Sequence, residues 1–137
     1  MRIPSPHALP IRVYYEDTDF SGVVYHASYL RFMERGRTEL LRDLGVDQQT
    51  AFSGEAGAAF GFAVRSMAID FLRPARMDDL LTIETTPAML KGASLDLTQR
   101  VLRGHEVLVE ARVRVACVSQ GRAARLPDWV RKKLSTA

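Results

Sequence analysis

A chain of 137 residues, 47% of them hydrophobic and 26% charged, has the length and composition of one globular domain over residues 1–137, which excludes global disorder. No apolar run reaches the roughly 18 residues of a membrane-spanning helix, and the N-terminal MRIPSPHALP lacks the apolar stretch of a secretory signal, so we expect a cytoplasmic protein. The net charge of +3 comes from scattered basic residues without a nucleic-acid-binding motif, so no nucleic-acid partner is expected. Cys117 is the single cysteine, which excludes an internal disulfide, and we expect it to be a packed core thiol.

The first predicted element is a short strand at Ile11 and Val13, which leads into the acidic segment YYEDTDFSGVVYHASY of residues 14–29. This segment places three acidic side chains, a glycine turn and a histidine where the strand should end and a helix should begin. Amides at a helix start lack partners and carry partial positive charge, so they can polarise a carbonyl oxygen. A carboxylate held beside such donors is a candidate acid, base or nucleophile.

A long amphipathic helix is predicted over residues 27–44, because apolar side chains recur there at helical spacing with charged residues between them. A helix of that length spans about 27 Å, and Gly45 supplies a left-handed stop after it. On this helix Glu34 is expected to pair with Arg37 or with a neighbouring strand. Residues 47–57 predict a connecting segment with a short helical turn.

From residue 60 the apolar periodicity changes to two, which predicts strands. The first of these covers residues 60–71, and its phase slips by one residue between Val64 and Met67, as happens at a β-bulge. Three further strands are predicted over residues 81–85, 95–101 and 107–117. Short turns separate these strands and favour antiparallel pairing. Residues 127–134 predict a short amphipathic cap at the C-terminal end.

Together these elements predict an α+β fold in which a curved antiparallel sheet of about five strands wraps around one long central helix. Such a sheet has one apolar face, and the long helix is the only predicted element able to cover it. Several strands then remain at an edge or keep apolar surface open, which favours a homo-oligomer.

This element order resembles the hot-dog-fold thioesterases when it is taken with Y-x-D-T-D-x-x-G-V-V-Y-H-x-x-Y over residues 15–29 and E-x-x-R-T-E over residues 34–39. More narrowly, it resembles the Tol-Pal-associated acyl-CoA thioesterase subgroup of the 4-hydroxybenzoyl-CoA thioesterase family. The resemblance includes FLRPARMDD over residues 71–79 and KGASLDLTQ over residues 91–99, so it covers nearly the whole chain. It implies hydrolysis of acyl-CoA thioesters by a dimer or tetramer, without a metal or other cofactor.

The resemblance also implies roles for individual residues. Asp19 corresponds to the catalytic carboxylate of the family, and the backbone amides of Tyr25 and His26 to the donors that polarise the thioester carbonyl. His26 and Tyr15 occupy positions implicated as supporting groups. Three residues near strand ends are suggested as contacts for the CoA phosphates: Arg73, Lys91 and Ser94.

The residues leave several alternatives open. Asp19 acts either as a nucleophile or as a general base on water, and a role limited to capping the helix is the competing interpretation. DTDFSG also fits the start of a calcium-binding loop, but Ser28 stands where that loop needs a bidentate glutamate. A transition-metal site lacks a second His or Cys at ligand spacing. Asp17 is expected to be structural.

Two other functions compete with hydrolysis. One is a binding or scaffold protein peripheral to the inner membrane and linked to envelope or phospholipid-synthesis machinery, with inner-membrane-associated proteins or an acyl carrier protein as partners. The other is a hot-dog dehydratase acting on acyl carrier protein substrates, but the histidine motif of those enzymes is not found in this sequence.

Overall fold

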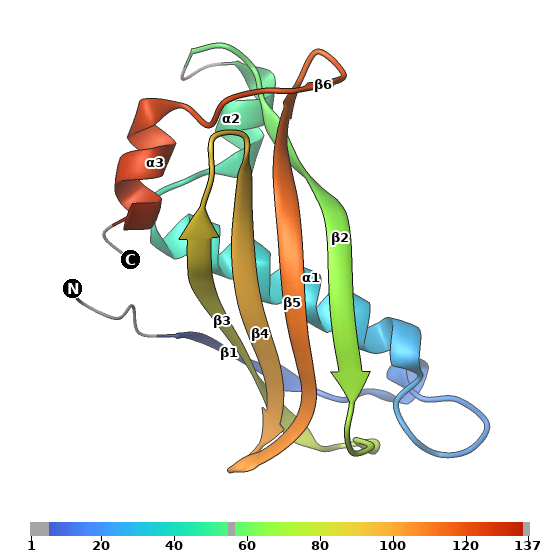
Figure 1. Cartoon of the computed structure of the whole chain (residues 1–137). Coiled ribbons are helices and arrows are strands. Elements are labelled where there is room, and N and C mark those ends of the chain that lie inside the picture. The colour runs from blue at the N-terminus through green and yellow to red at the C-terminus, as the bar shows by residue number, and fades with distance from the viewer. Residues whose placement is uncertain (1–5, 55–56, 136–137) are drawn as a thin grey trace.

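A curved antiparallel sheet wraps around the long helix α1 (His26–Asp43), which crosses the concave side of the sheet (Figure 1). The computed structural model describes residues 6–54 and 57–135. Its strands are β1 (His7–Arg12), β2 (Gly61–Phe71), β3 (Leu80–Leu90), β4 (Ser94–Arg103), β5 (Glu106–Ser119) and β6 (Arg122–Ala123). The other helices are α2 (Gln48–Ser53) and α3 (Asp128–Ser135), and a 3-10 turn at Tyr15–Asp17 follows β1. The sheet order is β1-β3-β4-β5-β2, with β6 paired to β5 and every pair antiparallel.

The elements agree with the predicted α+β fold. The helix predicted over residues 27–44 occupies residues 26–43, and the expected bulge appears as a register shift between Val64 and Ser66 where β2 pairs with β5. The two-residue strand β6 was not predicted, since it exists only because the chain reverses at Gln120 and Gly121, both in left-handed conformations. Within the described residues no helix combines the length and apolar character needed to cross a membrane.

The helix lies very close to the sheet because Gly36 has no side chain. A Cβ atom added at Gly36 would come within 2.8 Å of Ile83 Cγ2 and 2.9 Å of Thr85 Oγ1. About one helical turn before this contact, Phe32 and Met33 are buried almost completely, with 1% and 0% exposed. Each such burial contributes about 1.5–3 kcal/mol relative to an exposed side chain, so this stretch of α1 is the centre of the core.

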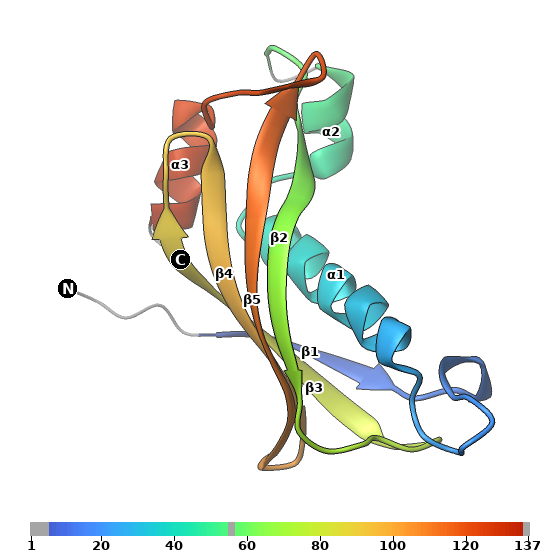
Figure 2. The ribbon, with the colours of Figure 1, turned by 45° about the vertical axis from the view of Figure 1, so that its right-hand side comes forward.

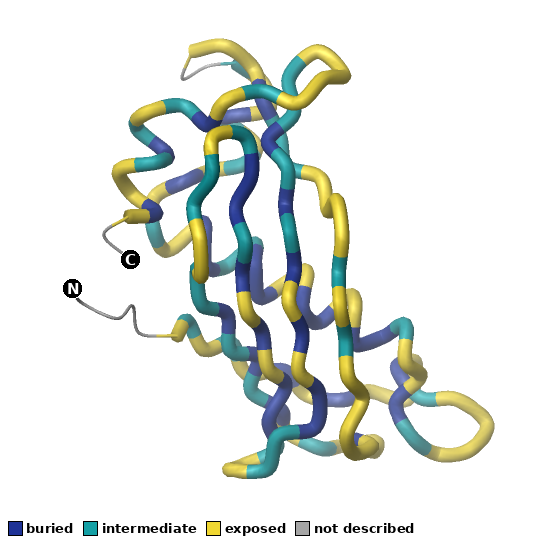
Figure 3. Tube along the Cα trace, in the orientation of Figure 1, coloured by how far each residue is buried: buried dark blue, intermediate teal, exposed yellow. Residues whose placement is uncertain are grey.

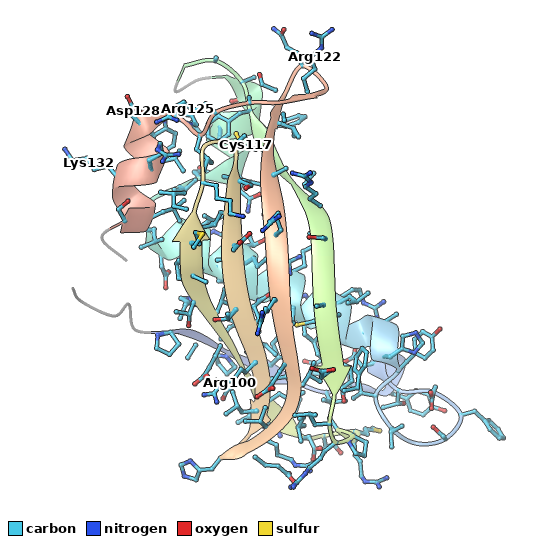
Figure 4. The ribbon with its side chains drawn as sticks, in the orientation of Figure 1. Arg100, Cys117, Arg122, Arg125, Asp128 and Lys132 are labelled. Carbon is cyan, nitrogen blue, oxygen red and sulfur yellow. The ribbon has the colours of Figure 1, made fainter. Side chains whose placement is uncertain are left out.

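Cys117 belongs to the same core. It is fully buried on β5 (Figure 4), and burial raises the pKa of its thiol above the ordinary value. A protonated, enclosed thiol is a poor nucleophile. The prediction of a packed core thiol is therefore confirmed.

Strand β2 forms one edge of the sheet and is the least covered of the long strands (Figure 3). Val64 and Phe71 lie on its helix side and remain 48% and 49% exposed. An edge strand that exposes apolar side chains and unpaired backbone groups favours association with another chain. The end of this edge lies next to the start of α1.

Candidate active site

The segment between β1 and α1 is a hydrogen-bonded loop that projects beyond the start of the helix (Figure 2). Its tip is a tight turn in which the Asp19 amide donates to the Val23 carbonyl and the Gly22 amide donates to the Asp19 carbonyl, both at 3.0 Å. Gly22 has a φ of 84°, a left-handed conformation that a residue with a side chain adopts only at a cost. The turn therefore fixes the backbone on both sides of Asp19.

This loop is attached to the segment between β2 and β3. The Val24 amide donates to the Ala75 carbonyl at 2.8 Å, and the Ala75 amide donates to the hydroxyl of Tyr29 at 3.0 Å. Tyr29 is 3% exposed and belongs to the first turns of α1. The loop, the helix start and the β2–β3 connection are thus held as one unit.

Asp17 is structural, as expected. Its carboxylate accepts a hydrogen bond from the Tyr14 amide at 2.8 Å, and its carbonyl accepts one from the Tyr25 amide at 2.9 Å and one from the Ser28 hydroxyl at 3.1 Å. The prediction that Tyr25 supplies a free amide to an oxyanion is therefore wrong, because the single proton of that amide is already donated to Asp17.

The amides that follow at the helix start are available. Those of His26 and Ala27 donate to no acceptor in residues 6–54 or 57–135. They are the first two amides of α1, where the helix dipole adds partial positive charge. Of the two predicted donors, His26 thus has an available amide and Tyr25 does not, and Ala27 offers a second available amide; their role toward an oxyanion stays a prediction.

The Asp19 carboxylate is exposed and oriented by Ser21. Its Oδ1 accepts hydrogen bonds from both the amide and the hydroxyl of Ser21. These bonds lower the pKa of Asp19 below its ordinary value, and the nearby His26 adds a smaller effect in the same direction. Asp19 is thus a carboxylate at neutral pH, which both a nucleophile and a general base require. Sequence reasoning missed Ser21, although a serine two residues after an aspartate is a common turn signal.

The His26 ring lies among aromatic neighbours. Its centroid is 4.4 Å from that of Tyr25 and 6.2 Å from that of Phe71, at the end of β2. Phe71 also contacts Tyr29, with 5.8 Å between the centroids, so it bridges the helix start and the sheet edge. The Tyr15 ring is 78% exposed and its hydroxyl has no hydrogen bond in the described part of the chain. The structure thus places Asp19 and His26 near each other but gives Tyr15 no contact with either.

The three residues suggested as CoA contacts do not come together in one chain. Arg73 follows β2 and pairs with Glu106 at 2.6 Å, whereas Lys91 and Ser94 flank the β3–β4 turn at the other end of the sheet. The ten residue steps of β3 separate the two ends by roughly 33 Å. A single CoA therefore meets Arg73 together with Lys91 only if different subunits supply them.

The acidic loop does not form a metal site in this structure. No group of three or more His, Cys, Asp or Glu side chains within residues 6–54 and 57–135 is arranged to hold a metal ion. The Asp17 carboxylate, which would be the first ligand of a calcium loop, binds the Tyr14 amide instead.

Comparisons with known proteins identify the family of this chain. The family model described as thioesterase-like superfamily matches residues 13–134. The acyl-CoA thioesterase YbgC of Haemophilus influenzae is 49% identical over 115 residues, which cover 84% of this chain and 82% of that protein. The acyl-CoA thioester hydrolase YbgC of Escherichia coli O6:H1 is 47% identical over 110 residues, covering 80% and 79%. The crystal structure of a probable thioesterase from Bartonella henselae, 48% identical, has a TM-score of 0.87 and covers 90% of this chain and 100% of that chain. This chain therefore belongs to the thioesterase-like superfamily and has its hot-dog fold.

Proposed function

We propose that this protein hydrolyses acyl-CoA thioesters to a free acid and CoA. The observation that carries the proposal is the position of an ionised Asp19 in the loop that leads into the free amides of His26 and Ala27. Relatives of nearly half-identical sequence are named as acyl-CoA thioesterases, which supports the same activity here.

In the proposed reaction the two free amides donate hydrogen bonds to the thioester carbonyl oxygen and stabilise the negative charge that develops on it. If Asp19 is the general base, it takes a proton from water as the water oxygen attacks the carbonyl carbon. The carbon–sulfur bond then breaks, and the thiolate of CoA recovers the proton. If Asp19 is the nucleophile, its oxygen displaces the thiolate and forms an anhydride. Water then hydrolyses this anhydride to the free acid and Asp19, and a proton released from the water ends on the thiolate of CoA. Both routes yield one acid and one thiol.

The proposal includes a dimer or tetramer, because Asp19 is exposed in a single chain. Large apolar side chains near it are exposed as well, and they would lie within a subunit contact: Tyr25, Leu30, Phe71 and Leu72. Phe71 belongs to the edge strand β2 and contacts His26 and Tyr29 at the start of α1. A second copy would thus enclose the carboxylate and remove water from around the thioester. We place this oligomer in the cytoplasm or at the inner surface of the membrane.

A test of the activity is the release of thiol from a panel of acyl-CoAs. Asp19→Asn keeps the shape of the side chain and should lower kcat/KM by roughly 10²- to 10⁴-fold. Asp128→Asn is the matched control, since Asp128 is exposed at the start of α3, remote from the loop (Figure 4). Full activity in Asp19→Asn, with its oligomer and fold intact, would remove Asp19 from the mechanism.

A scaffold function is favoured by one observation. The loop exposes the rings of Tyr14, Tyr15 and Phe20, and Phe20 has no contact that reduces its accessible surface. Exposed aromatic residues of this kind are typical of binding surfaces for protein or membrane interfaces. Release of no thiol from any acyl-CoA, by a folded oligomer, would favour this function, with an acyl carrier protein or an inner-membrane-associated protein as the partner.

A further inference from the structure

A cavity of about 260 Å³ lies between the second half of α1 and strand β2. Most of its wall is apolar, and the polar exceptions come from α1 and from the start of α2. The apolar wall includes Leu41, Phe62, Val64, Leu97 and Val115. The polar lining consists of Glu34, Arg37, Thr38 and Gln48. Arg37 is the only one of these four that is buried.

The Arg37 side chain is held rigidly. It is 9% exposed, and its Nη1 donates to Gln99 Oε1 at 2.9 Å. Gln99 is itself 1% exposed and donates through Nε2 to the Met33 carbonyl and to Thr85 Oγ1, both at 2.9 Å. Hydrogen bonds at both Oε1 and Nε2 therefore fix the side-chain amide of Gln99, and this amide in turn fixes Nη1 of the Arg37 guanidinium.

The charge of Arg37 has no carboxylate partner in the described part of the chain. The expected pair with Glu34 does not form, since no ion pair within 4.0 Å joins them, and Glu34 is exposed on the rim of the cavity. Burial lowers the pKa of the Arg37 guanidinium below its ordinary value, and the charge of Glu34 partly opposes this effect. A buried cation without a counter-ion is costly, so the site is complementary to an anion.

The free part of the guanidinium has the shape that binds a carboxylate. Its Nε and Nη2 groups make no hydrogen bond within residues 6–54 and 57–135, while Nη1 is held by Gln99. Nε and Nη2 form a planar fork that matches the two oxygens of a carboxylate. Because Arg37 lines the cavity, a carboxylate can reach this fork from inside it.

We infer that Arg37 is a specificity-determining residue that binds a carboxylate at the far end of the acyl group, so that the protein favours thioesters of dicarboxylic acids. This inference rests on the proposed thioesterase function. At the roughly 30 Å³ that a water molecule occupies in the liquid, the cavity holds about eight non-hydrogen atoms. That size suits the terminal carboxylate of an acyl group together with the last few carbons of its chain.

The position of Arg37 along the helix sets the distance to the reacting carbonyl. Eleven residue steps separate it from His26, or roughly 16 Å of helix. The carboxylate therefore binds far from the amides of its own chain, and in an oligomer the acyl group can also enter from the active site of the second copy. A series of substrates with increasing chain length identifies the distance between the bound carboxylate and the reacting carbonyl.

The test compares kcat/KM for matched pairs of substrates: hexanoyl-CoA with adipoyl-CoA, octanoyl-CoA with suberoyl-CoA, and dodecanoyl-CoA with dodecanedioyl-CoA. The wild type should favour the dicarboxylic member of at least one pair by roughly 10- to 100-fold, the value of a hydrogen-bonded charge. Arg37→Met keeps most of the side-chain volume and should bring that ratio to about one, whereas Arg37→Lys, which keeps the charge without the fork, should give an intermediate ratio.

Two further variants sharpen the result. Glu34→Gln should raise the dicarboxylic preference, because it removes a negative charge from the cavity rim. Arg35→Met is the matched control: Arg35 is exposed on the same helix and does not line the cavity, so its ratio should equal that of the wild type.

Each other outcome overturns the inference. Activity that shows no preference in any pair removes the carboxylate-binding role of Arg37 and leaves the proposed hydrolysis intact. A preference that Arg37→Met and Arg37→Lys both retain has the same meaning. If both variants lose the oligomer while the dicarboxylic-to-monocarboxylic ratios of kcat/KM stay unchanged, the guanidinium fork of Arg37 binds a carboxylate of a second subunit and not the substrate. A wild type that releases no thiol from any substrate refutes the proposed function and the inference together.

Discussion

The start and the middle of helix α1 handle charge in opposite ways. At the start, the Asp19 carboxylate is exposed and the helix contributes only backbone amides. In the middle, Gly36 presses the helix against the sheet, and the Arg37 charge is enclosed beside Gln99. An incoming molecule can enclose the Asp19 carboxylate at little cost in free energy, whereas the surroundings of Arg37 are already in place before any ligand binds. In the proposed mechanism, therefore, the reacting group needs a second chain or a substrate to enclose it, while the proposed specificity element is formed by one chain alone.

The largest effect on stability is expected from Gln99→Leu. This change removes the acceptor for Arg37 and the donor to Met33 and Thr85 from a fully buried position. Leaving a buried charged group without its partner should lower the free energy of unfolding by about 3 kcal/mol, measured by urea denaturation. Thr98→Val, at an exposed neighbouring position on β4, should change it little. A loss below about 1 kcal/mol would mean that Arg37 is not fixed by Gln99.

Gly36→Ala should have the next largest effect. The added methyl group would collide with Ile83 and Thr85, so α1 and β3 must move apart. Overpacking of this kind should cost about 2 kcal/mol in urea denaturation, despite the better helix propensity of alanine. Arg35→Ala, one residue earlier and exposed, meets no collision and should be nearly neutral, because arginine and alanine have similar helix propensities. Equal stability of the two variants would contradict the close approach.

Gly22→Ala tests the loop that precedes the start of α1. The positive φ of Gly22 is unfavourable for alanine, although no neighbour would touch the added methyl group. Strain of about 1 kcal/mol should therefore appear in thermal unfolding, together with reduced kcat as the turn around Asp19 loosens. Gly121→Ala, also left-handed and open but in the β5–β6 turn at the other end of the sheet, should show the same loss of stability with unchanged kcat. A similar loss of kcat in both variants would mean that the effect on catalysis does not come from the turn around Asp19.

The smallest effect is expected from Ser21→Ala, and it concerns pH. The bonds from Ser21 lower the pKa of Asp19, and the proposed activity needs the ionised form, so the rate falls as pH drops through that pKa. Removing the hydroxyl should move the acidic limb of the kcat/KM profile to higher pH, with less than about tenfold loss at neutral pH. Ser135→Ala, in α3, is the control. An unmoved acidic limb would show that Asp19 is not the group that titrates.

Sequence reasoning was most successful where the signal is local. The helix over residues 26–43 and the bulge near Val64 follow from apolar periodicity, and each was located within one or two residues. The resemblance likewise directed attention to Asp19 and to the start of the helix. These features depend on neighbours in the chain, which a sequence displays directly.

The errors concern contacts between distant or backbone groups. The Tyr25 amide is occupied because a 3-10 turn, capped by the Asp17 side chain, brings the Asp17 carbonyl back to it, and this backbone contact was not expected from the sequence. Arg37 binds Gln99, which is 62 residues away, rather than Glu34, which is one helical turn away. The residues suggested for CoA remain a prediction that depends on the arrangement of subunits, because antiparallel strands place Arg73 and Lys91 at opposite ends of the sheet in one chain.

The free edge of β2 has a consequence for measurement. If the reacting carboxylate is enclosed only when two copies meet, turnover per chain must decline on dilution below the dissociation constant of the pair, long before any helix or strand melts. Specific activity would then vary with enzyme concentration, and a titration of that dependence would report the strength of the subunit contact without any structural probe.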